Sequence, residues 1–300
     1  MQHSHYIGRF APSPTGRLHA GSLVAAVASY LDAKAHHGQW LVRIEDVDEG
    51  RTAAGAAESI LALLPQLGMH WDGDVVWQSA RKDLYQAAYD RLVGHTYPCG
   101  CNRREIADSR LGTAPDGAAI YPGTCRHSLA PGRSARSLRV RVPDAATGAD
   151  EISFDDRIAG HVVQHLAGDS GDFVLKRADG FWAYQLAVVV DDAEQRVTDV
   201  VRGADLLDST PRQIYLQRLL GVPTPRYLHV PVVRNADGEK LSKQTGAIAV
   251  SPGNEAQVLA VLQQAAASLG LPVQHCASLD AFWPMAIAAW ARRYCPQLQR

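Results

Sequence analysis

The sequence predicts an α/β fold in which a parallel sheet is flanked by helices, and three observations support this prediction. The stretch from Tyr6 to Glu49 reads as a short apolar strand, a turn rich in proline and glycine, a long alanine-rich helix and a second strand. Apolar segments of strand character return later, at VTDVVRG and YLHVPVV. The chain has 300 residues, of which 46% are hydrophobic, so a sizeable core can form.

Composition and charge exclude some classes of protein. The formal net charge of -1 argues against a broadly basic nucleic-acid binder, although the distribution of charge allows a local basic face. No apolar run approaches the length of a membrane span, and the first residues lack the charged start and apolar core of a secretory signal. We therefore expect a cytoplasmic protein that contacts no membrane. We also expect a monomer, because no long amphipathic or heptad segment is left outside the core.

The turn between the first strand and the first helix predicts an anion site. In the segment APSPTGRLHAGS, Pro12 and Pro14 fix the backbone, while Gly16 and Gly21 leave out side chains where a ligand approaches closely. The turn opens into a helix near His19. Because free N–H groups and the positive end of the dipole favour anions at a helix start, we expect phosphate chemistry here.

The second strand brings two charged residues to one edge of the sheet. A strand from Leu41 to Ile44 would pair parallel to the first strand through a right-handed crossover. This pairing places Arg9 and Glu45 together at the carboxyl ends of neighbouring strands, where α/β sheets bind ligands. Two interpretations stay open from the residues alone, a paired and partly exposed salt bridge or a ligand site.

Periodicity and turn residues predict the other elements. Helices are expected over Ala20–Ala35, Ala53–Leu67, Arg81–Gly94, Asn254–Leu269 and Leu279–Tyr294, and strands in pieces over Ser137–Leu175 and over Tyr227–Val233. The apolar run VVVDD is expected to be a strand of the core sheet, with VTDVVRG as another. Asp191 and Asp192 end that run and could bind a metal or act in catalysis, but a strand-end Asp that caps the next helix is the commoner explanation.

A loop with two lysines follows the tight turn NADG. Lys240 and Lys243 in EKLSKQTGAIAV flank Leu241 and Ser242 and would form a mobile cationic clamp for a polyphosphate. The alternative is a solvated charged loop, which is the more common meaning of such a pair taken alone.

The cysteines favour a metal site over a disulfide framework. Of the five, Cys99, Cys101 and Cys125 are crowded together, and Cys276 and Cys295 read as buried thiols. Zinc requires four soft or borderline donors in a tetrahedron, and three thiolates supply all but one of them. The candidates for the fourth donor are Tyr121, His127 and His95. Three reduced thiols in a compact loop are the alternative.

Five segments in this order, APSPTGRLHAGS, RIEDVD, AVVVDD, VVRG and KLSKQ, resemble the catalytic domain of the glutamyl-tRNA synthetases, a class I aminoacyl-tRNA synthetase family. The segment HAGS at residues 19–22 is similar to the family's HIGH element. KLSKQ at residues 240–244 is similar to its KMSKS loop, with Gln244 where the family has Ser. The resemblance covers roughly Tyr6 to Val250 and implies a Rossmann-type parallel sheet flanked by helices, with an inserted zinc-binding α/β subdomain.

Only about fifty residues follow the KMSKS-like loop, whereas a full glutamyl-tRNA synthetase carries a large helical anticodon-binding region there. The chain therefore resembles the truncated glutamyl-queuosine tRNA(Asp) synthetases, which attach glutamate to queuosine at the wobble position of tRNA(Asp). The partners implied are ATP with Mg2+, L-glutamate and tRNA(Asp) carrying queuosine. The alternatives are a small glutamyl-tRNA synthetase that charges a tRNA acceptor end and a non-catalytic synthetase-like regulator that binds glutamate or tRNA.

The resemblance also implies roles for individual residues. The catalytic residues it implies are His19, Lys240 and Lys243. The glutamate pocket it implies comprises Arg9, Ala11, Ser13, Glu45, Tyr184 and Arg202. The ATP-binding residues it implies are Pro12, His19, Gly21, Ser22, Lys240, Leu241, Ser242 and Lys243. The ligands it implies for one structural zinc ion are Cys99, Cys101, Tyr121 and Cys125.

Four parts are expected along the chain. Residues 1–95 form the first half of the catalytic domain, and residues 96–175 form the inserted zinc-binding and acceptor-type subdomain. Residues 176–250 form the second half with the KMSKS-like loop, and residues 251–300 form a short helical C-terminal region.

Overall fold

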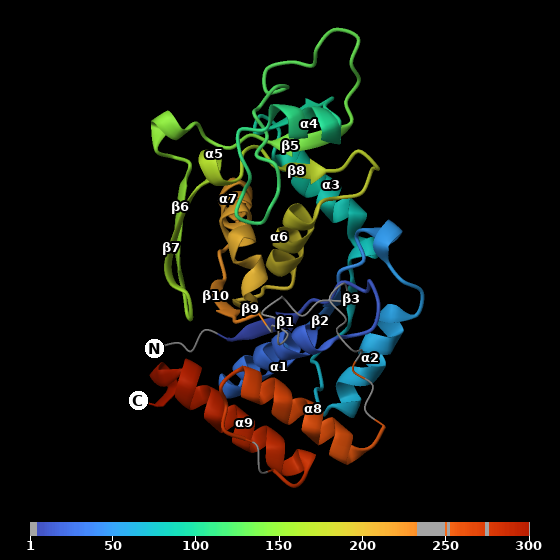
Figure 1. The fold of residues 1–300 in the computed structure, drawn as a ribbon, viewed down its shortest axis with the longest axis vertical. Helices are drawn as coiled ribbons and strands as arrows, with labels where there is room; N and C mark the ends of the chain where they lie inside the picture. Colours follow the sequence, from blue (N-terminus) through green and yellow to red (C-terminus); the bar gives the residue numbers. More distant parts are fainter. Residues whose placement is uncertain (1–4, 233–249, 251–252, 274–275, 300) are drawn as a thin grey trace.

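The computed structural model describes residues 5–232, 250, 253–273 and 276–299. At its centre lie parallel strands with helices on both sides, so the α/β prediction is confirmed (Figure 1). One sheet has the order β3-β2-β1 and the next has the order β9-β10-β6-β7. The two meet where the amide of Thr198, directly before β9, donates to the carbonyl of Ile7 in β1 at 2.9 Å. Strand β1 therefore has β2 on one side and β9 on the other, and the strand order reverses at β1.

The elements have the following bounds. The strands are β1 Ile7–Phe10, β2 Gln39–Ile44, β3 Val76–Trp77, β4 Thr96–Cys99, β5 Ser137–Val140, β6 Glu151–Asp156, β7 Gly160–His165, β8 Val174–Lys176, β9 Asp199–Gly203 and β10 Arg226–Val230. The helices are α1 Ala20–Ala35, α2 Ala56–Gln66, α3 Lys82–Arg91, α4 Arg103–Ser109, α5 Leu166–Asp169, α6 Tyr184–Glu194, α7 Thr210–Leu220, α8 Glu255–Ser268 and α9 Leu279–Tyr294. None of the helices within the described ranges combines the length and apolar character of a membrane span.

Helix α1 has the bounds that its periodicity predicts. His19 caps it, and Leu23, Val27 and Leu31 are buried against the sheet at helical spacing. After the helix the chain turns back at Gly38, where a Cβ atom would stand 2.5 Å from the carbonyl oxygen of Tyr6. Only glycine allows this approach, and it lets β2 pair with β1 in parallel register.

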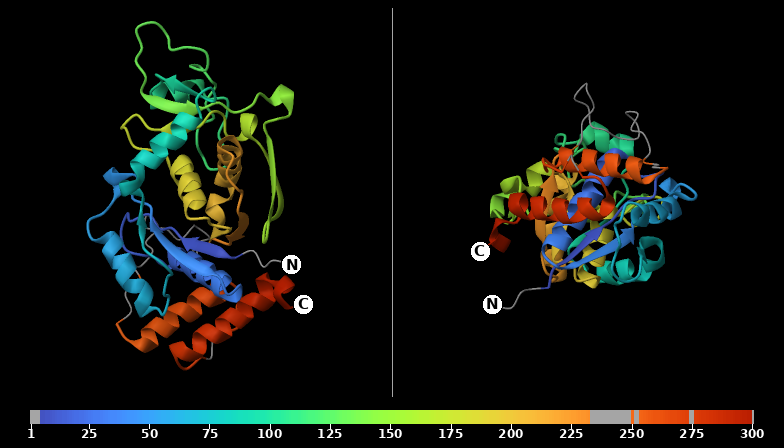
Figure 2. Two further views of the ribbon diagram at one scale, coloured as in Figure 1. Left: turned by 180° about the vertical axis from the view of Figure 1, so that it is seen from behind. Right: turned by 90° about the horizontal axis from the view of Figure 1, so that it is seen from below.

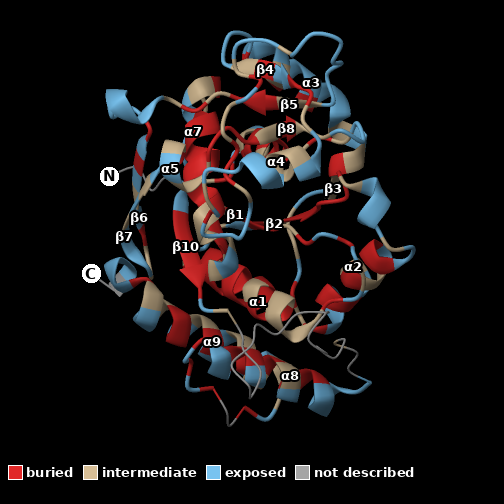
Figure 3. Cartoon of the chain, turned by 45° about the horizontal axis from the view of Figure 1, so that its top comes forward, coloured by how far each residue is buried: buried red, intermediate tan, exposed pale blue. Residues whose placement is uncertain are grey.

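Two hydrophobic cores lie on opposite sides of the sheet. One contains α1, α2 and the C-terminal helices α8 and α9, which pack side by side under α1 (Figures 1 and 2). The other contains α6 and α7 with residues of β6, β9 and β10. The expected buried thiols Cys276 and Cys295 both lie in the first core, which confirms that prediction. In Figure 3 the central strands β1, β2 and β10 are largely buried, whereas α4 and the outer faces of α8 and α9 are exposed.

A buried carboxylate in α1 links the C-terminal helix α9 to the core. Asp32 of α1 is fully buried and accepts hydrogen bonds from Tyr6 Oη at 2.6 Å and from Trp290 Nε1 of α9 at 2.8 Å. Arg157, which follows β6, makes a two-pronged pair with it at 2.6 and 2.8 Å. These partners compensate for the burial of the charge, so the pKa of Asp32 is lowered although burial alone would raise it.

The expectation for VVVDD is wrong. Residues 188–192 lie in α6 and do not form a strand. Every residue from Leu186 to Asp192 is buried, and a helix that is apolar on nearly all sides has the same sequence appearance as a buried strand. Asp191 and Asp192 therefore do not cap a following helix. They lie inside α6, near its C-terminal end, and pair with Arg81 and Arg43.

Above the sheet, the chain forms a separate small sheet of the order β4-β5-β8, with α4 beside it (Figure 1). Its strands are antiparallel. The hairpin of β6 and β7 extends along the side of the molecule. The predicted turn NADG and the lysine loop lie outside the described residues, and the expected four-part division of the chain stays a prediction.

Candidate active site

A cleft of about 620 Å³ opens at the carboxyl ends of the central strands. Its lining includes the last residues of β1, β9 and β10, namely Phe10, Gly203 and Val230, and Glu45 directly after β2. The cleft thus lies where β1 and β9 meet and the strand order reverses, which is the edge where open α/β sheets bind ligands. Of the residues assigned to glutamate and ATP, it brings together Arg9, Ala11, Pro12, Ser13, His19, Gly21, Ser22, Glu45, Tyr184 and Arg202.

The turn at one end of the cleft is held by backbone hydrogen bonds. The amide of Glu45 donates to the Pro12 carbonyl and the amide of Ala53 to the Pro14 carbonyl, both at 2.9 Å. Gly16 has a φ of 145°, a value that side chains disfavour. This turn therefore has one defined course into α1.

His19 is the N-cap of α1 and its ring stays at the helix start. Its Nδ1 accepts from the Ser22 amide at 3.3 Å, so in the neutral ring the proton is on Nε2, 3.0 Å from the Ser22 hydroxyl. The first turn of α1 contains no acidic residue. Because the dipole is positive there and no carboxylate in that turn opposes it, the site suits a phosphate group.

Arg9 and Glu45 do not form the partly exposed salt bridge that was the simpler interpretation. Both are buried, and Arg9 makes a side-on pair with Asp192 of α6, with Nε–Oδ1 and Nη2–Oδ2 distances of 3.2 and 3.3 Å. Asp192 also accepts from Arg43 Nη2 at 2.7 Å. Burial would raise the pKa of Asp192, but Arg9 and Arg43 outweigh it and the pKa is lowered. Asp192 is thus ionised and fixes the Arg9 guanidinium at the cleft wall.

Glu45 accepts fewer hydrogen bonds in this network than Asp192 does. Its Oε1 accepts one hydrogen bond from Arg43 at 3.3 Å. Burial raises the pKa of Glu45, and the opposing effects of Arg43 and Arg9 do not cancel it. A buried carboxylate with a raised pKa at the wall of a cleft would be stabilised by a cationic ligand group.

Buried hydrogen bonds to His229 and Thr210 fix the orientation of the Arg202 side chain. Its Nε donates to His229 Nε2 at 3.0 Å, and its Nη2 donates to Thr210 Oγ1 at 2.8 Å. His229 Nε2 is therefore the acceptor, and Nδ1 carries the proton and donates to Asp156 Oδ2 at 2.7 Å. Burial and Arg202 lower the pKa of His229, which keeps the ring neutral. The Tyr184 hydroxyl accepts from Arg202 Nη1 at 3.3 Å, so both side chains face the cleft together.

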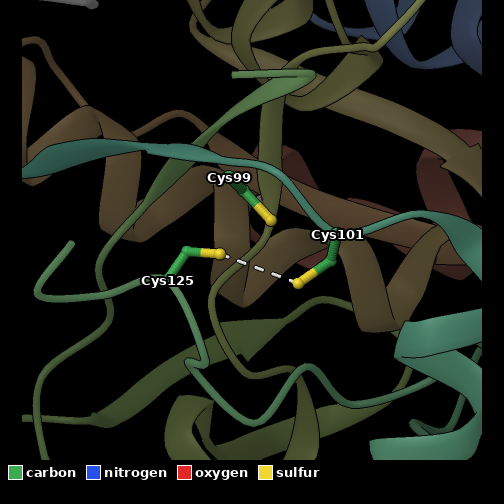
Figure 4. A group of neighbouring side chains, drawn as sticks. All are labelled: Cys99, Cys101 and Cys125. Carbon is green, nitrogen blue, oxygen red and sulfur yellow. Dashed lines mark hydrogen bonds between the residues drawn. The ribbon is translucent and has the colours of Figure 1, made fainter. Parts of the chain in front are cut away.

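Away from the cleft, three thiols converge in the small upper sheet (Figure 4). Their sulfur atoms lie within 4.8 Å of one another, and Cys101 and Cys125 are 3.7 Å apart. The Tyr121 hydroxyl is 3.3 Å from Cys99 Sγ and 3.5 Å from Cys101 Sγ. His127 and His95 are exposed, and neither belongs to the group of thiols. The structure thus favours Tyr121 as the fourth member, and the three thiols are donors of the kind that zinc prefers.

Comparisons with known proteins agree with this geometry. A family model described as tRNA synthetases class I (E and Q), catalytic domain, matches residues 7–260. The chain belongs to this class I synthetase family. This family consists of ligases, and the match spans both the turn before α1 and all the residues of the cleft.

Two similar proteins that align with this chain over nearly their full length have the same name. A protein of Janthinobacterium sp. (strain Marseille), named glutamyl-Q tRNA(Asp) synthetase, is 66% identical over 97% of this chain and 99% of its own length. One of Verminephrobacter eiseniae (strain EF01-2) with the same name is 64% identical over 98% of this chain and 100% of its own length.

Solved structures of the synthetase family share the fold. The crystal structure of the glutamate-tRNA synthetase from Elizabethkingia anophelis has a TM-score of 0.76 and 25% identity over 93% of this chain. The chain spans 65% of the length of that synthetase.

Reasoning from the sequence missed several residues of the site. Arg43, Asp156 and His229 were not singled out, although each was visible as a polar residue inside or at the end of an apolar strand. A buried polar group requires a partner, so such residues signal a network. The assigned residues Lys240, Leu241, Ser242 and Lys243 lie outside the described residues, and their roles stay predictions.

Proposed function

We propose that the chain activates L-glutamate with ATP to glutamyl-adenylate and transfers the glutamyl group to queuosine at the wobble position of tRNA(Asp). The observation that supports this most strongly is the match to glutamyl-Q tRNA(Asp) synthetases over nearly the full length of both chains. The charges in the cleft are consistent with it, because glutamate carries two carboxylates and one ammonium group.

In this proposal the amino acid lies between Arg9, Glu45 and Arg202. The two guanidiniums hold carboxylate oxygens, since planar N–H forks match that geometry. Glu45 takes the α-ammonium, which would keep it ionised despite its burial. The Tyr184 hydroxyl bridges to the substrate, and Ala11 and Ser13 line the same wall. Arg9 and Arg202 need no reorganisation on binding, because Asp192 and His229 already fix them.

ATP lies at the turn and the start of α1, with its phosphates near His19, Gly21 and Ser22 and its base and ribose toward Pro12. An oxygen of the glutamate α-carboxylate attacks the α-phosphorus, and the bond to pyrophosphate breaks. No protein nucleophile takes part. The chain contributes positioning and positive charge from His19, the helix start, Lys240 and Lys243, and the Mg2+ that accompanies ATP neutralises phosphate charge.

In the second step a hydroxyl of the queuosine ring attacks the activated carbonyl carbon. The bond to the adenylate oxygen breaks, AMP leaves and the hydroxyl proton is released. The products are a glutamyl ester on the modified nucleoside and AMP.

A structural zinc ion completes the proposal, bound by Cys99, Cys101, Tyr121 and Cys125. When bound, it would crosslink β4, the start of α4 and the loop before β5, which lack a large core of their own. Burial would raise the pKa of Cys99, but hydrogen bonds from Tyr121, from the Cys101 backbone and from Arg139 lower it, whereas burial and the neighbouring thiols raise the pKa of Cys101.

Pyrophosphate exchange with glutamate and ATP, in the absence of tRNA, tests the first step and separates the alternatives. The proposal predicts exchange without tRNA. A glutamyl-tRNA synthetase that charges an acceptor end would be expected to require tRNA, and a non-catalytic regulator would show no exchange under either condition.

A further inference from the structure

Arg139 in β5 is a buried cation that makes no ion pair with a carboxylate among the described residues. It is 7% exposed, and its Nη1 donates to the backbone carbonyl of Asp172 at 2.7 Å. Its Nε is buried without a hydrogen-bond partner in the described part of the chain. A guanidinium keeps its charge in proteins, and burying a charge without an opposite charge nearby is costly. The position of Arg139 therefore indicates another source of negative charge.

The carboxylate of Asp172 does not supply that charge, because other donors occupy it. Its Oδ2 accepts from Tyr97 Oη and from Arg126 Nε, both at 2.6 Å. Its Oδ1 accepts from Arg126 Nη2 and from the Val142 amide, both at 2.8 Å. Arg126 is thus the cation that pairs with Asp172, and Arg139 reaches only the backbone carbonyl of the same residue.

The register of the small sheet places Arg139 beside Cys99. In the antiparallel pair of β4 and β5, Cys99 is opposite Ser137 and Tyr97 is opposite Arg139. Residues two positions apart in a strand share a face of the sheet. Arg139 and Cys99 are therefore diagonal neighbours on one face, a separation that a long side chain can span.

The guanidinium of Arg139 also contacts the tyrosine that lies among the three thiols. Its central carbon is 4.0 Å from the centre of the Tyr121 ring. The hydroxyl of Tyr121 is 3.3 Å from Cys99 Sγ and accepts from the Cys125 amide at 3.0 Å. The buried cation and the candidate zinc ligands are therefore parts of one packed unit.

Charge balance relates this unit to the proposed zinc ion. Three thiolates and a divalent zinc ion leave one net negative charge, even when the Tyr121 hydroxyl keeps its proton. Cys99, Tyr121 and Cys125 are buried, so water screens this charge poorly. The positive charge of Arg139 would neutralise it.

We propose that Arg139 is the counter-ion of the zinc–thiolate cluster and that its positive charge increases the affinity of the cluster for zinc. This inference rests on the zinc site of the proposed function, to which it adds a residue outside the ligand set. Residues that surround the ligands of a metal site typically contribute about 10- to 100-fold to metal affinity.

Two substitutions separate the charge of Arg139 from its shape. Arg139→Lys and Arg139→Gln both remove the planar guanidinium, but only Arg139→Lys keeps a positive charge. Arg136→Met is the matched control, because it removes a positive charge from an exposed side chain directly before β5. Competition with a chromophoric chelator measures the zinc affinity of each full-length protein, and circular dichroism shows that each is folded.

The dissociation constant for zinc should rise about 10- to 100-fold in Arg139→Gln and stay near the wild-type value in Arg139→Lys and Arg136→Met. The absorption bands of bound Co2+ report the coordinating thiolates, and they should keep their shape in every variant because the ligands are unchanged. If Arg139→Gln does not fold, Arg139→Met replaces it, since an apolar side chain of similar length avoids an unpaired buried amide.

Equal zinc affinities of the wild type and Arg139→Gln would overturn the proposal. Equal weakening in Arg139→Lys and Arg139→Gln, or an altered Co2+ spectrum in Arg139→Gln, would also overturn it, because the shape of the side chain and not its charge would then matter. The failure of the zinc site itself is distinct. A wild type that binds neither zinc nor Co2+ refutes both proposals, whereas tight zinc binding that does not depend on the charge at position 139 refutes the counter-ion alone.

Discussion

Asp156→Asn is the sharpest test of the buried chain behind Arg202. Oδ1 of Asp156 accepts from the amides of Ile158 and Ala159 at 2.9 and 2.8 Å. Oδ2 accepts from His229 Nδ1 at 2.7 Å and from the His229 amide at 3.1 Å. All four partners are donors. An asparagine has the same shape but only one acceptor oxygen, so its NH2 group must face a pair of donors in either orientation.

The cost follows from these contacts. Two hydrogen bonds to a charged acceptor are lost at about 1.5–3 kcal/mol each, so the free energy of unfolding should fall by about 3–6 kcal/mol. The orientation with NH2 toward His229 also moves the ring proton from Nδ1 to Nε2, where it opposes the N–H of Arg202 Nε. Arg202 then loses its alignment, and kcat/KM for glutamate should fall roughly 10- to 100-fold through a raised KM.

Asp155→Asn is the matched control, because it makes the same change one residue earlier in β6, at a side chain that is 88% exposed. It should alter stability by less than about 0.5 kcal/mol and leave the KM for glutamate unchanged. Denaturant unfolding and pyrophosphate exchange measure the two effects. If Asp156→Asn matched Asp155→Asn in both, His229 would have no role in positioning Arg202.

The stability of the wild type should also depend on pH through Asp156. Its pKa is lowered in the folded chain: burial would raise it, but the hydrogen bonds from His229 and the backbone amides prevail. The stability that Asp156 contributes is therefore fully present above its unfolded pKa of about 4 and is lost as the pH falls through the lower folded value. Asp156→Asn should lack this part of the acid dependence, and a pH series of unfolding curves for both proteins tests it.

Three further substitutions test other parts of the account. Glu45→Gln should raise the KM for glutamate at least roughly tenfold. It should also remove the rise in KM that is expected of the wild type when acid protonates Glu45, and an unchanged KM would exclude an ammonium contact. Cys125→Ser should release bound zinc, measured by metal analysis, and lower the melting temperature, whereas full zinc content would exclude Cys125 as a ligand. Lys243→Ala should lower pyrophosphate exchange at least roughly tenfold, and unchanged exchange would contradict its role.

The sequence alone predicted those parts of the structure that a local residue pattern determines. The bounds of α1 and α9 match the sequence prediction, because each helix is capped by a side chain at its start, and α9 buries one apolar face at helical spacing. The cysteine spacing likewise indicated a cluster, and the structure brings the three thiols together.

The sequence alone did not predict contacts between side chains that lie far apart in the chain. The run VVVDD was mistaken for a strand, since a helix buried on all sides gives no amphipathic signal. Arg9 pairs with Asp192 and Arg43 pairs with both Asp192 and Glu45, and no spacing rule reveals ion pairs between β1, β2 and α6. His229 looked like an ordinary strand residue, and only its contact with Arg202 gives it a role.

The most direct test of the central claim is transfer of labelled glutamate to tRNA(Asp) prepared with and without queuosine. Label is expected only on the tRNA that carries queuosine, and it should remain on that tRNA when its acceptor end has been oxidised. Equal labelling of both tRNAs, or labelling that requires an intact acceptor end, would contradict it.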